Sequence, residues 1–332
     1  MDIKVIFSSG GKYNNNPDQK IADEDTLVAV NKVVEALKNS GHSTDTIKIT
    51  PSKIDSVKKL KAHAVFNLCE WSGKDYPLGV EVLKNLESYK IPHTGADSKS
   101  YEWCCDKIVM KKMFDSFGIP TPKWTFVDPK DNKKTIVQDV VKLKFPIIIK
   151  PAYEHCAIGI NKKSVIRSKK EFVKNIASLL KKYKEPILVE EFIEGREFTI
   201  TVVKNHRLHI FPPAEVIFKT KNRDKLLAFD TKWYEDKPTF YSKVVSNKVL
   251  SQNLKNLARK AFIKMECKGY VRVDVRMKRD NFFVLEINVN PSILPEECYG
   301  LTVSTEAAGW TFNKLVDEIT KAAVTNQIQS DL

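Results

Sequence analysis

The chain has 332 residues, of which 42% are hydrophobic and 29% are charged. This length fits two or three compact domains, and the composition excludes a disordered or fibrous protein. No apolar run approaches the roughly eighteen residues that a membrane helix needs. The N-terminus MDIKVIFSSGG lacks the features of a signal peptide, and the six cysteines include no CxxC pair. The sequence therefore predicts a cytoplasmic protein without membrane association.

The net charge is +14, from 55 Lys and Arg against 41 Asp and Glu. A basic chain can bind nucleic acid, a membrane surface or an anionic substrate. The lysines, however, occur in scattered pairs, without one dense block or interleaved aromatic residues. This pattern favours a solvated, lysine-rich surface, and nucleic-acid binding is kept as a minor alternative.

The first hundred residues alternate between strand and helix patterns. The segment ends with TGADSKS, which is typical of a linker. Strands are predicted at 3–9, 44–50, 63–69 and 91–95, and helices at 22–39 and 79–89. Gly41 ends the first helix, where a glycine tolerates positive φ. The order predicts a βαβ-type unit with a parallel sheet.

The rest of the chain mixes helices with paired strands, so the predicted fold class is α/β and α+β. Helices are predicted at 101–117, 169–182 and 248–266, with a last helix near the C-terminus. Strands are predicted at 124–128, 145–151, 186–193, 197–204, 269–277 and 282–290. Gly118 and the prolines after it end the first of these helices.

Two late strands, GYVRVDVRM and FFVLEINVN, carry polar residues on one face. Because side chains alternate along a strand, Arg272 shares a face with Asp274, and Glu286 shares one with Asn288. Oxygen ligands of this kind suit Mg²⁺, with Mn²⁺ as an alternative, and leave positions for phosphates. A solvent-facing sheet with incidental charges explains these two strands equally well.

Three further features favour the metal and phosphate interpretation. Lys150 ends an apolar strand, where it can reach a phosphate, and Asp106-Lys107 offers a second cation on a helix. Glu190, Glu191 and Glu197 flank a glycine turn and can hold ribose hydroxyls. Each residue alone is typical of a charged surface, but their order along the chain is not.

This order resembles the ATP-grasp superfamily, and most closely the D-alanine–D-alanine ligases. The resemblance rests on DK, IKP, a loop ending in Gly159, VEEFIEGREF, RVDV and EINVNP, and it covers nearly the whole chain. It implies an ATP-grasp fold preceded by a βαβ-type pre-ATP-grasp domain. The implied domains are an N-terminal substrate-side domain (1–98), a central lobe (99–190) and a C-terminal lobe with the metal and catalytic residues (191–325).

The resemblance also implies roles for residues at matching positions. The implied nucleotide contacts are Lys107 and Lys150 on the phosphates, Glu190 with the backbone of Glu191 and Ile193 on the adenine, and Glu197 on the ribose. The implied metal ligands are Asp274, Glu286 and Asn288. Arg272 would stabilise the acyl phosphate and the tetrahedral intermediate, and Lys232 would reach the phosphates from a mobile loop.

The sequence departs from the D-alanine ligases in their glycine-rich phosphate loop and in the segments where they bind their amino acids. The Gly-Ser-Ser-x-Gly run is replaced by residues 155–159, HCAIG, and the run after EINVNP becomes Ser292 followed by ILPEE. A family histidine is replaced near Cys69-Glu70. Glu70, Ser292, Glu296 and Glu297 thus become candidate substrate contacts, although an exposed loop position is the commoner explanation for each.

We therefore expect an ATP- and Mg²⁺-dependent ligase that forms an amide bond through an acyl phosphate. The expected substrates are an amino acid or a small peptide, with a product other than D-alanyl-D-alanine. One alternative is a ligase that tailors a peptide or natural product. Another is a non-catalytic ATP-binding or nucleic-acid-binding protein. A homodimer is a further expectation, because homodimers are common among the resembled ligases.

Overall fold

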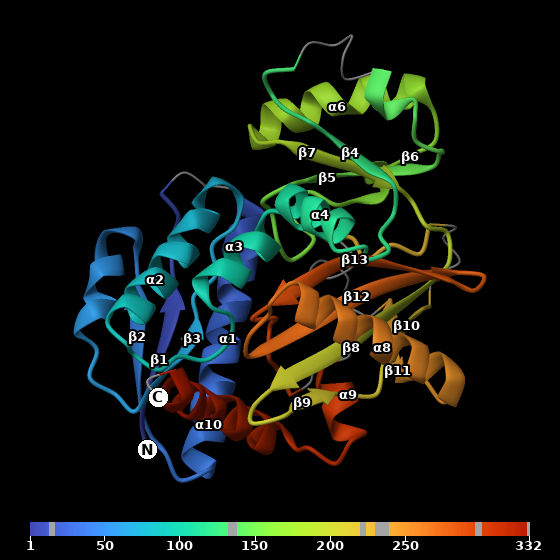
Figure 1. The fold of residues 1–332 in the computed structure, drawn as a ribbon. Helices are drawn as coiled ribbons and strands as arrows, with labels where there is room; N and C mark the ends of the chain where they lie inside the picture. The colour runs from blue at the N-terminus through green and yellow to red at the C-terminus, as the bar shows by residue number, and fades with distance from the viewer. Residues whose placement is uncertain (13–16, 132–137, 220–223, 230–238, 296–300, 331–332) are drawn as a thin grey trace.

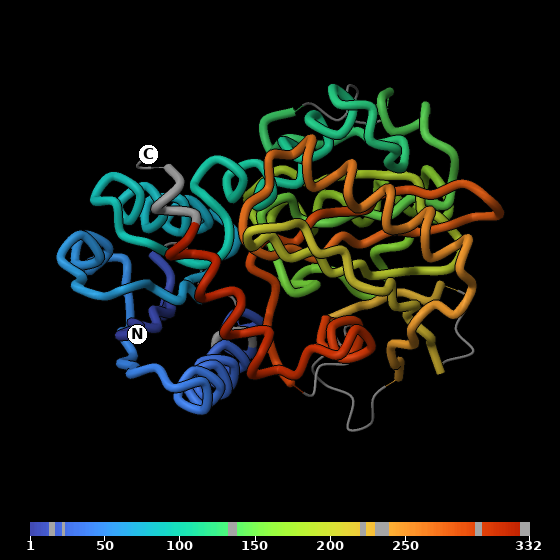
Figure 2. Tube along the Cα trace, turned by 60° about the horizontal axis from the view of Figure 1, so that its bottom comes forward, coloured from blue at the N-terminus to red at the C-terminus, as the bar shows by residue number. Residues whose placement is uncertain are grey.

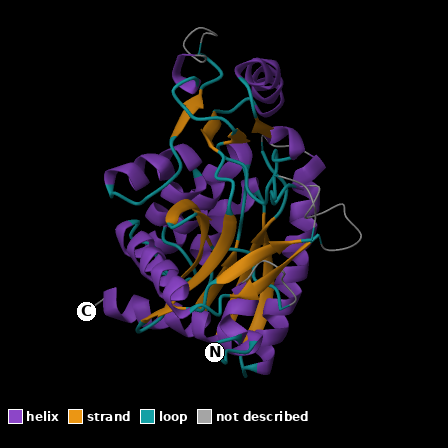
Figure 3. Ribbon diagram, turned by 90° about the vertical axis from the view of Figure 1, so that its right-hand side faces the viewer, coloured by secondary structure: helices purple, strands orange, loops and turns teal. Residues whose placement is uncertain are grey.

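Three sheets organise the molecule, each with its own helices (Figure 1). The computed structural model describes residues 1–12, 17–131, 138–219, 224–229, 239–295 and 301–330. Figure 3 shows the strands in the interior and the helices around them. The sheets follow one another along the chain, so each is built largely from its own stretch of sequence.

The first sheet is parallel, with strand order β2-β1-β3. Its strands are β1 (Asp2–Ser8), β2 (Ser43–Ile49) and β3 (Ala64–Leu68). The associated helices are α1 (Pro17–Asn39), the 3₁₀ segments η1 (Pro51–Lys59) and η2 (Gly73–Asp75), and α2 (Tyr76–Ser88). Gly41 follows α1 with φ of 80°, as the sequence predicts. The predicted strand at 91–95 is wrong, because His93 forms only an isolated bridge with Val65.

The predicted helix at 101–117 is divided in two. α3 (Ser98–Cys105) ends at Asp106, and α4 (Lys107–Ser116) begins directly after it. The Asp106 carboxylate accepts hydrogen bonds from the backbone N–H groups of Ile108 and Val109, at 2.8 and 3.2 Å. An aspartate in this position caps a new helix, which explains the break. The cap therefore makes Lys107 the first residue of α4.

The second sheet has strand order β4-β7-β5-β6, and its neighbours are antiparallel. Its strands are β4 (Trp124–Val127), β5 (Ile147–Pro151), β6 (Val165–Ile166) and β7 (Ile187–Glu191), with η3 (Lys162–Ser164) before β6. α6 (Lys169–Tyr183) covers one face through Phe172 and Ile176. The other face is left for the cleft described below.

The third sheet has strand order β11-β10-β8-β12-β13, with β9 paired to β8. Its strands are β8 (Arg196–Lys204), β9 (Leu208–Ile210), β10 (Ala214–Phe218), β11 (Phe240–Val244), β12 (Tyr270–Lys278) and β13 (Asn281–Val289). α8 (Lys248–Lys264) packs on the apolar face, where Val271, Val273 and Val275 are fully buried. The alternation predicted for β12 is therefore present, and its polar face points away from this core.

The C-terminal helix returns to the first sheet. After α9 (Leu301–Glu306), α10 (Phe312–Ser330) packs against α1 and β3. Figure 2 shows α10, in red, beside the blue α1. Leu315 and Val316 share one buried cluster with Ile3 of β1 and Val203 of β8. This core joins the first sheet to the third, which the sequence pattern did not indicate.

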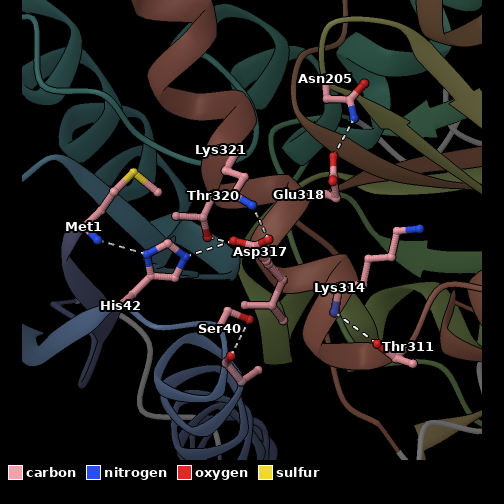
Figure 4. Close-up of polar contacts among 12 residues, drawn as sticks. Met1, Ser40, His42, Asn205, Thr311, Lys314, Asp317, Glu318, Thr320 and Lys321 are labelled. Atoms are coloured by element: carbon pink, nitrogen blue, oxygen red, sulfur yellow. Dashed lines mark hydrogen bonds and ion pairs between the residues drawn. The ribbon is translucent and has the colours of Figure 1, made fainter.

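Polar contacts fix α10 in this place (Figure 4). The ring of His42 donates from Nε2 to Asp317 at 2.9 Å, and its Nδ1 lies 3.2 Å from the N-terminal ammonium of Met1. Asp317 also accepts from Lys321 at 2.6 Å, and Asn205 donates to Glu318 at 2.9 Å. His42 therefore connects the N-terminus to α10 through its two ring nitrogens.

Replacing Asp317 with alanine tests this attachment. The change removes the acceptor of both His42 and Lys321, and we expect it to lower the free energy of unfolding by about 1–2 kcal/mol. Urea denaturation measures the loss. Asn313→Ala, on the exposed side of the same helix, is the matched control and should change stability by less than about 0.5 kcal/mol. Equal stability of the two variants would contradict the attachment.

Candidate active site

A cleft of about 350 Å³ lies between the second and third sheets and is closed at one end by the first. It gathers residues that are far apart in the sequence. The predicted site residues that line it are Glu70, Lys107, Lys150, Glu190, Glu191, Ile193, Glu197, Arg272, Asp274, Glu286, Asn288 and Ser292. Three others, Lys232, Glu296 and Glu297, lie outside the described residues. The roles assigned to these residues remain predictions.

One wall is the polar face of β12 and β13. Asp274 lies opposite Glu286 in the register of the two strands, and Arg272 lies opposite Asn288. Arg272 donates from Nε and Nη2 to the two oxygens of Asp274, at 2.8 and 2.9 Å. Asn288 donates to Asp274 at 2.8 Å. The four side chains therefore form one connected group, as alternation along two paired strands predicts.

The two carboxyl groups on this wall differ in acidity. Burial acts to raise the pKa of Glu286, but the charges of Lys107, Lys150 and Arg272 outweigh it and hold the pKa at about 2. For Asp274, burial and the neighbouring Glu286 raise the pKa, although Arg272 opposes the shift. Glu286 is thus a fixed negative charge at neutral pH.

A hard divalent cation fits this donor set. Two facing carboxylates and one amide oxygen are the oxygen ligands that Mg²⁺ prefers. Among the described residues, no three His, Cys, Asp or Glu side chains are grouped so as to hold a metal unaided. Asp274, Glu286 and Asn288 would supply three ligands, which leaves positions for phosphate oxygens and water around an ion of this kind.

The opposite wall contains a buried group of three charges. The Glu190 carboxylate lies between two lysines, with Oε1 2.7 Å from Nζ of Lys150 and Oε2 2.7 Å from Nζ of Lys111. Burial acts to raise the pKa of Glu190, but the two lysines outweigh it and the pKa lies below its ordinary value. This carboxylate, predicted to contact adenine, is already engaged by the two ammonium groups.

Arg276 is a site residue that the sequence reasoning missed. It donates to Glu197 Oε2 at 2.9 and 2.7 Å and to the carbonyl of Ile193 at 2.9 Å. Its guanidinium also lies 4.6 Å from the centre of the Phe192 ring. Its position two residues after Asp274 places it on the same strand face, so the signal was present in the alternation.

The loop after β5 adds backbone groups to the cleft. Lys107 donates through Nζ to the carbonyl of Glu154 and through its backbone N–H to the carbonyl of Ala152, the latter at 3.1 Å. Cys156 and Ala157 have φ of 53° and 63°, the left-handed region that non-glycine residues rarely adopt. A turn of this kind can present backbone N–H groups to an anion.

His155, in the same loop, remains uncharged. Burial and the positive charge of Lys107 lower the pKa of this histidine to about 3, although Glu286 opposes the shift. The loop therefore adds no further positive charge to the cleft at neutral pH. Any attraction for phosphate comes from its backbone and from the lysines.

The end of the cleft formed by the first sheet is acidic. Glu70 follows β3, and its backbone is fixed by Ser8, whose Oγ donates to the Glu70 carbonyl at 2.6 Å and accepts from its N–H at 2.9 Å. Asp25 of α1 also lines the cleft. The carboxylate of Glu70 therefore belongs to the end of the cleft formed by the first sheet, while Arg272 and the lysines lie on the other walls.

The fold has known counterparts among solved structures. A crystal structure of D-alanine–D-alanine ligase from Bacillus anthracis superposes with a TM-score of 0.79 and 20% identity, covering 99% of each chain. Together with the three sheets and the intervening cleft, this likeness defines the class of the protein as an ATP-grasp fold.

Sequence comparison then gives the family. A family model described as D-ala D-ala ligase C-terminus matches residues 113–321, and the chain belongs to this family. The D-alanine–D-alanine ligase of Carboxydothermus hydrogenoformans is 32% identical over 70% of this chain and 73% of its own. That of Pseudothermotoga lettingae is 27% identical over 97% and 100%, respectively. The protein is an ATP-dependent ligase of the type that forms carbon–nitrogen bonds.

No helix in the described part of the chain has both the length and the apolar character needed to cross a bilayer. This agrees with the absence of long apolar runs in the sequence.

The carboxyl group of Glu185, beside the loop after β5, should make the stability of the protein depend on pH. It is buried and accepts a 2.9 Å hydrogen bond from the backbone N–H of Tyr153, and burial raises its pKa to about 8. Between the ordinary carboxyl pKa of about 4.3 and pH 8, the folded state binds a proton that the unfolded state releases, so stability falls as pH rises.

Glu185→Gln removes this titration and keeps an oxygen acceptor for Tyr153. We expect equal stability of variant and wild type at pH 4.5, and a growing advantage for the variant up to pH 8. The slope should approach about 1.4 kcal/mol per pH unit at most. Urea midpoints measured across this range check it. Glu81→Gln, at an exposed position, is the matched control.

Proposed function

We propose that the protein uses ATP and Mg²⁺ to activate a substrate carboxylate as an acyl phosphate and transfers the acyl group to an amine. The observation that carries this proposal is the pair of opposed walls in one cleft. Asp274, Glu286 and Asn288 face one side, while Lys107 and Lys150 approach from the other. Metal-binding oxygens and phosphate-binding ammonium groups are thus available to the same triphosphate.

The reaction proceeds in two balanced steps. A carboxylate oxygen of the donor attacks the γ-phosphorus of ATP, the bond to the β,γ-bridging oxygen breaks, and ADP leaves. The acceptor amine then attacks the acyl carbon, inorganic phosphate leaves, and the nitrogen loses a proton to give the amide. Two anions meet in the first step, so Lys107 and Lys150 would lower their repulsion.

Arg272 has a second task in this scheme. Its planar guanidinium can hold the oxygens of the acyl group while negative charge builds on them during the attack by the amine. In the structure this guanidinium binds Asp274 in a bidentate manner. Moving to the substrate would release the carboxylate of Asp274. When bound, Mg²⁺ would be held by Asp274, Glu286 and Asn288 and would neutralise the triphosphate.

The charge distribution supports an amino acid as the donor. A zwitterion can place its carboxylate toward Arg272 and its ammonium toward Glu70, at the acidic end. The segment beginning at Ser292 and the residues near Glu70 differ from the D-alanine ligase motifs that bind amino acids. These departures support a product other than D-alanyl-D-alanine. Lys232 as a phosphate contact and Glu296 as a substrate contact belong to the same proposal, and both lie outside the described residues.

A cytoplasmic location and a homodimer are parts of the same proposal. Five cysteines among the described residues are free, which fits a reducing compartment. Size-exclusion chromatography with light scattering measures the oligomeric state.

Glu286→Gln tests the proposed metal site. The substitution keeps the size of the side chain and removes the fixed negative charge, so we expect ADP release to fall by at least about 100-fold. Circular dichroism should show an unchanged fold. Glu306→Gln, an exposed matched change, should retain full activity. Substantial turnover by Glu286→Gln would remove the metal assignment.

Glu70→Gln tests the proposed substrate class. Amino acids and dipeptides are screened for ADP release, and the best donor is then titrated. Loss of a charge-assisted hydrogen bond should raise the KM for that donor by about 10-fold or more, with the KM for ATP unchanged. Glu81→Gln is the control. Turnover only with a peptide would favour a tailoring ligase. Absence of turnover together with tight, salt-sensitive RNA binding would favour the nucleic-acid alternative.

A further inference from the structure

We infer that Lys111, which does not line the cleft, is a positioning residue that sets the charge and orientation of Lys150 through Glu190. This inference rests on the proposed function, because it assumes that Lys150 faces nucleotide phosphates. It extends that function by explaining how a buried lysine keeps its charge available to a ligand while it binds a carboxylate.

The three side chains form a buried chain of contacts. Lys111 is fully buried, Glu190 is 2% exposed and Lys150 is 6% exposed. Each lysine occupies a different oxygen of Glu190, at 2.7 Å in both cases. Each carboxylate oxygen therefore faces one ammonium group, so a change at either lysine alters the electrostatic environment of the other.

The charge balance of this group decides what Lys150 can do. Within this group, one carboxylate between two ammonium groups leaves a net charge of +1, and Lys150 is the member that faces the cleft and Glu286. Without Lys111, the carboxylate would neutralise Lys150 completely. In a site this buried, a neutral pair attracts a phosphate far less than an uncompensated cation does.

Hydrogen bonds also connect Lys111 to β13, which is part of the opposite wall. Its Nζ lies 2.5 Å from Oγ1 of Thr121, and that hydroxyl donates to the carbonyl of Val284 at 2.8 Å. The N–H of Val284 in turn donates to the carbonyl of Pro120 at 2.7 Å. Val284 belongs to β13, two residues before Glu286. The contacts thus run from the proposed metal wall through α4 to Lys150.

A simpler role for Lys111 is structural, as one half of a buried ion pair. Removing one partner of such a pair commonly destabilises a protein by leaving the other charge unpaired. A stability measurement alone therefore cannot distinguish the two roles. A double-mutant cycle on ligand binding can, because a positioning role requires that the effect of Lys111 depends on the charge of Glu190.

The experiment measures the dissociation constant of a non-hydrolysable β,γ-imido analogue of ATP, with Mg²⁺, by titration calorimetry. The variants are Lys111→Met, Glu190→Gln and the double change. We expect Lys111→Met to weaken binding on the order of 10-fold or more. In the Glu190→Gln background, the same change should alter binding by less than about 3-fold, because no carboxylate remains to neutralise Lys150.

Lys112→Met is the matched control, since it makes the same substitution at the exposed neighbouring position. It should bind the analogue like the wild type. Urea midpoints of all variants report folding separately. If Lys111→Met is too unstable to assay, Lys111→Arg, which keeps the charge, replaces it and should bind within about 3-fold of the wild type.

An equal effect of Lys111→Met in both backgrounds, or no effect in either, overturns the positioning role. Loss of binding by Lys111→Arg in a folded protein overturns it as well, because the charge is retained. A wild-type protein that does not bind the analogue overturns the proposed nucleotide site itself, and this outcome is distinct because it appears without any substitution.

Discussion

Charge compensation in a buried cleft is the constraint on which the rest of this structure depends. Carboxylates and cations lie together where water is largely excluded, and none of them is stable there without a partner. Glu190 is held by two lysines, Glu197 by Arg276, and Asp274 by Arg272. The cleft is therefore built before any ligand enters, and Lys107 and Lys150 are the cations in it that suit a polyanion.

The sheets place these charges with little freedom. Alternation along β12 and β13 sends valines into the core against α8 and sends Arg272, Asp274 and Glu286 into the cleft. Lys150 and Glu190 stand on the adjacent strands β5 and β7, where Lys150 pairs with Leu188 and Glu190 lies diagonally from it at an Nζ–Oε1 distance of 2.7 Å. Rigid strands on both walls hold the proposed phosphate and metal positions in a fixed relation, which phosphoryl transfer requires.

The first sheet contributes a different kind of wall. The buried cluster of the first sheet also contains residues of α10 and Val203 near the end of β8. These contacts attach the acidic end of the cleft to the third sheet. Gly95 marks this junction, because a Cβ there would lie 1.9 Å from Oδ1 of Asn290, at the end of β13. Asn290 also accepts a 2.8 Å hydrogen bond from the N–H of Ala96. Glu70 thus has a defined position relative to Arg272.

By itself, the sequence determined the class of the fold, the polar faces of β12 and β13, and most of the residues that meet in the cleft. These follow from local periodicity and from motif order, which act over a few residues. Only the tertiary structure decided that Asp106 divides a helix, that α10 returns to the first sheet, and that Lys111 and Arg276 complete the charge balance. The reason is that a buried charge is stabilised by partners distant in the chain, as Lys111 is by Glu190, and no local pattern specifies such a partner.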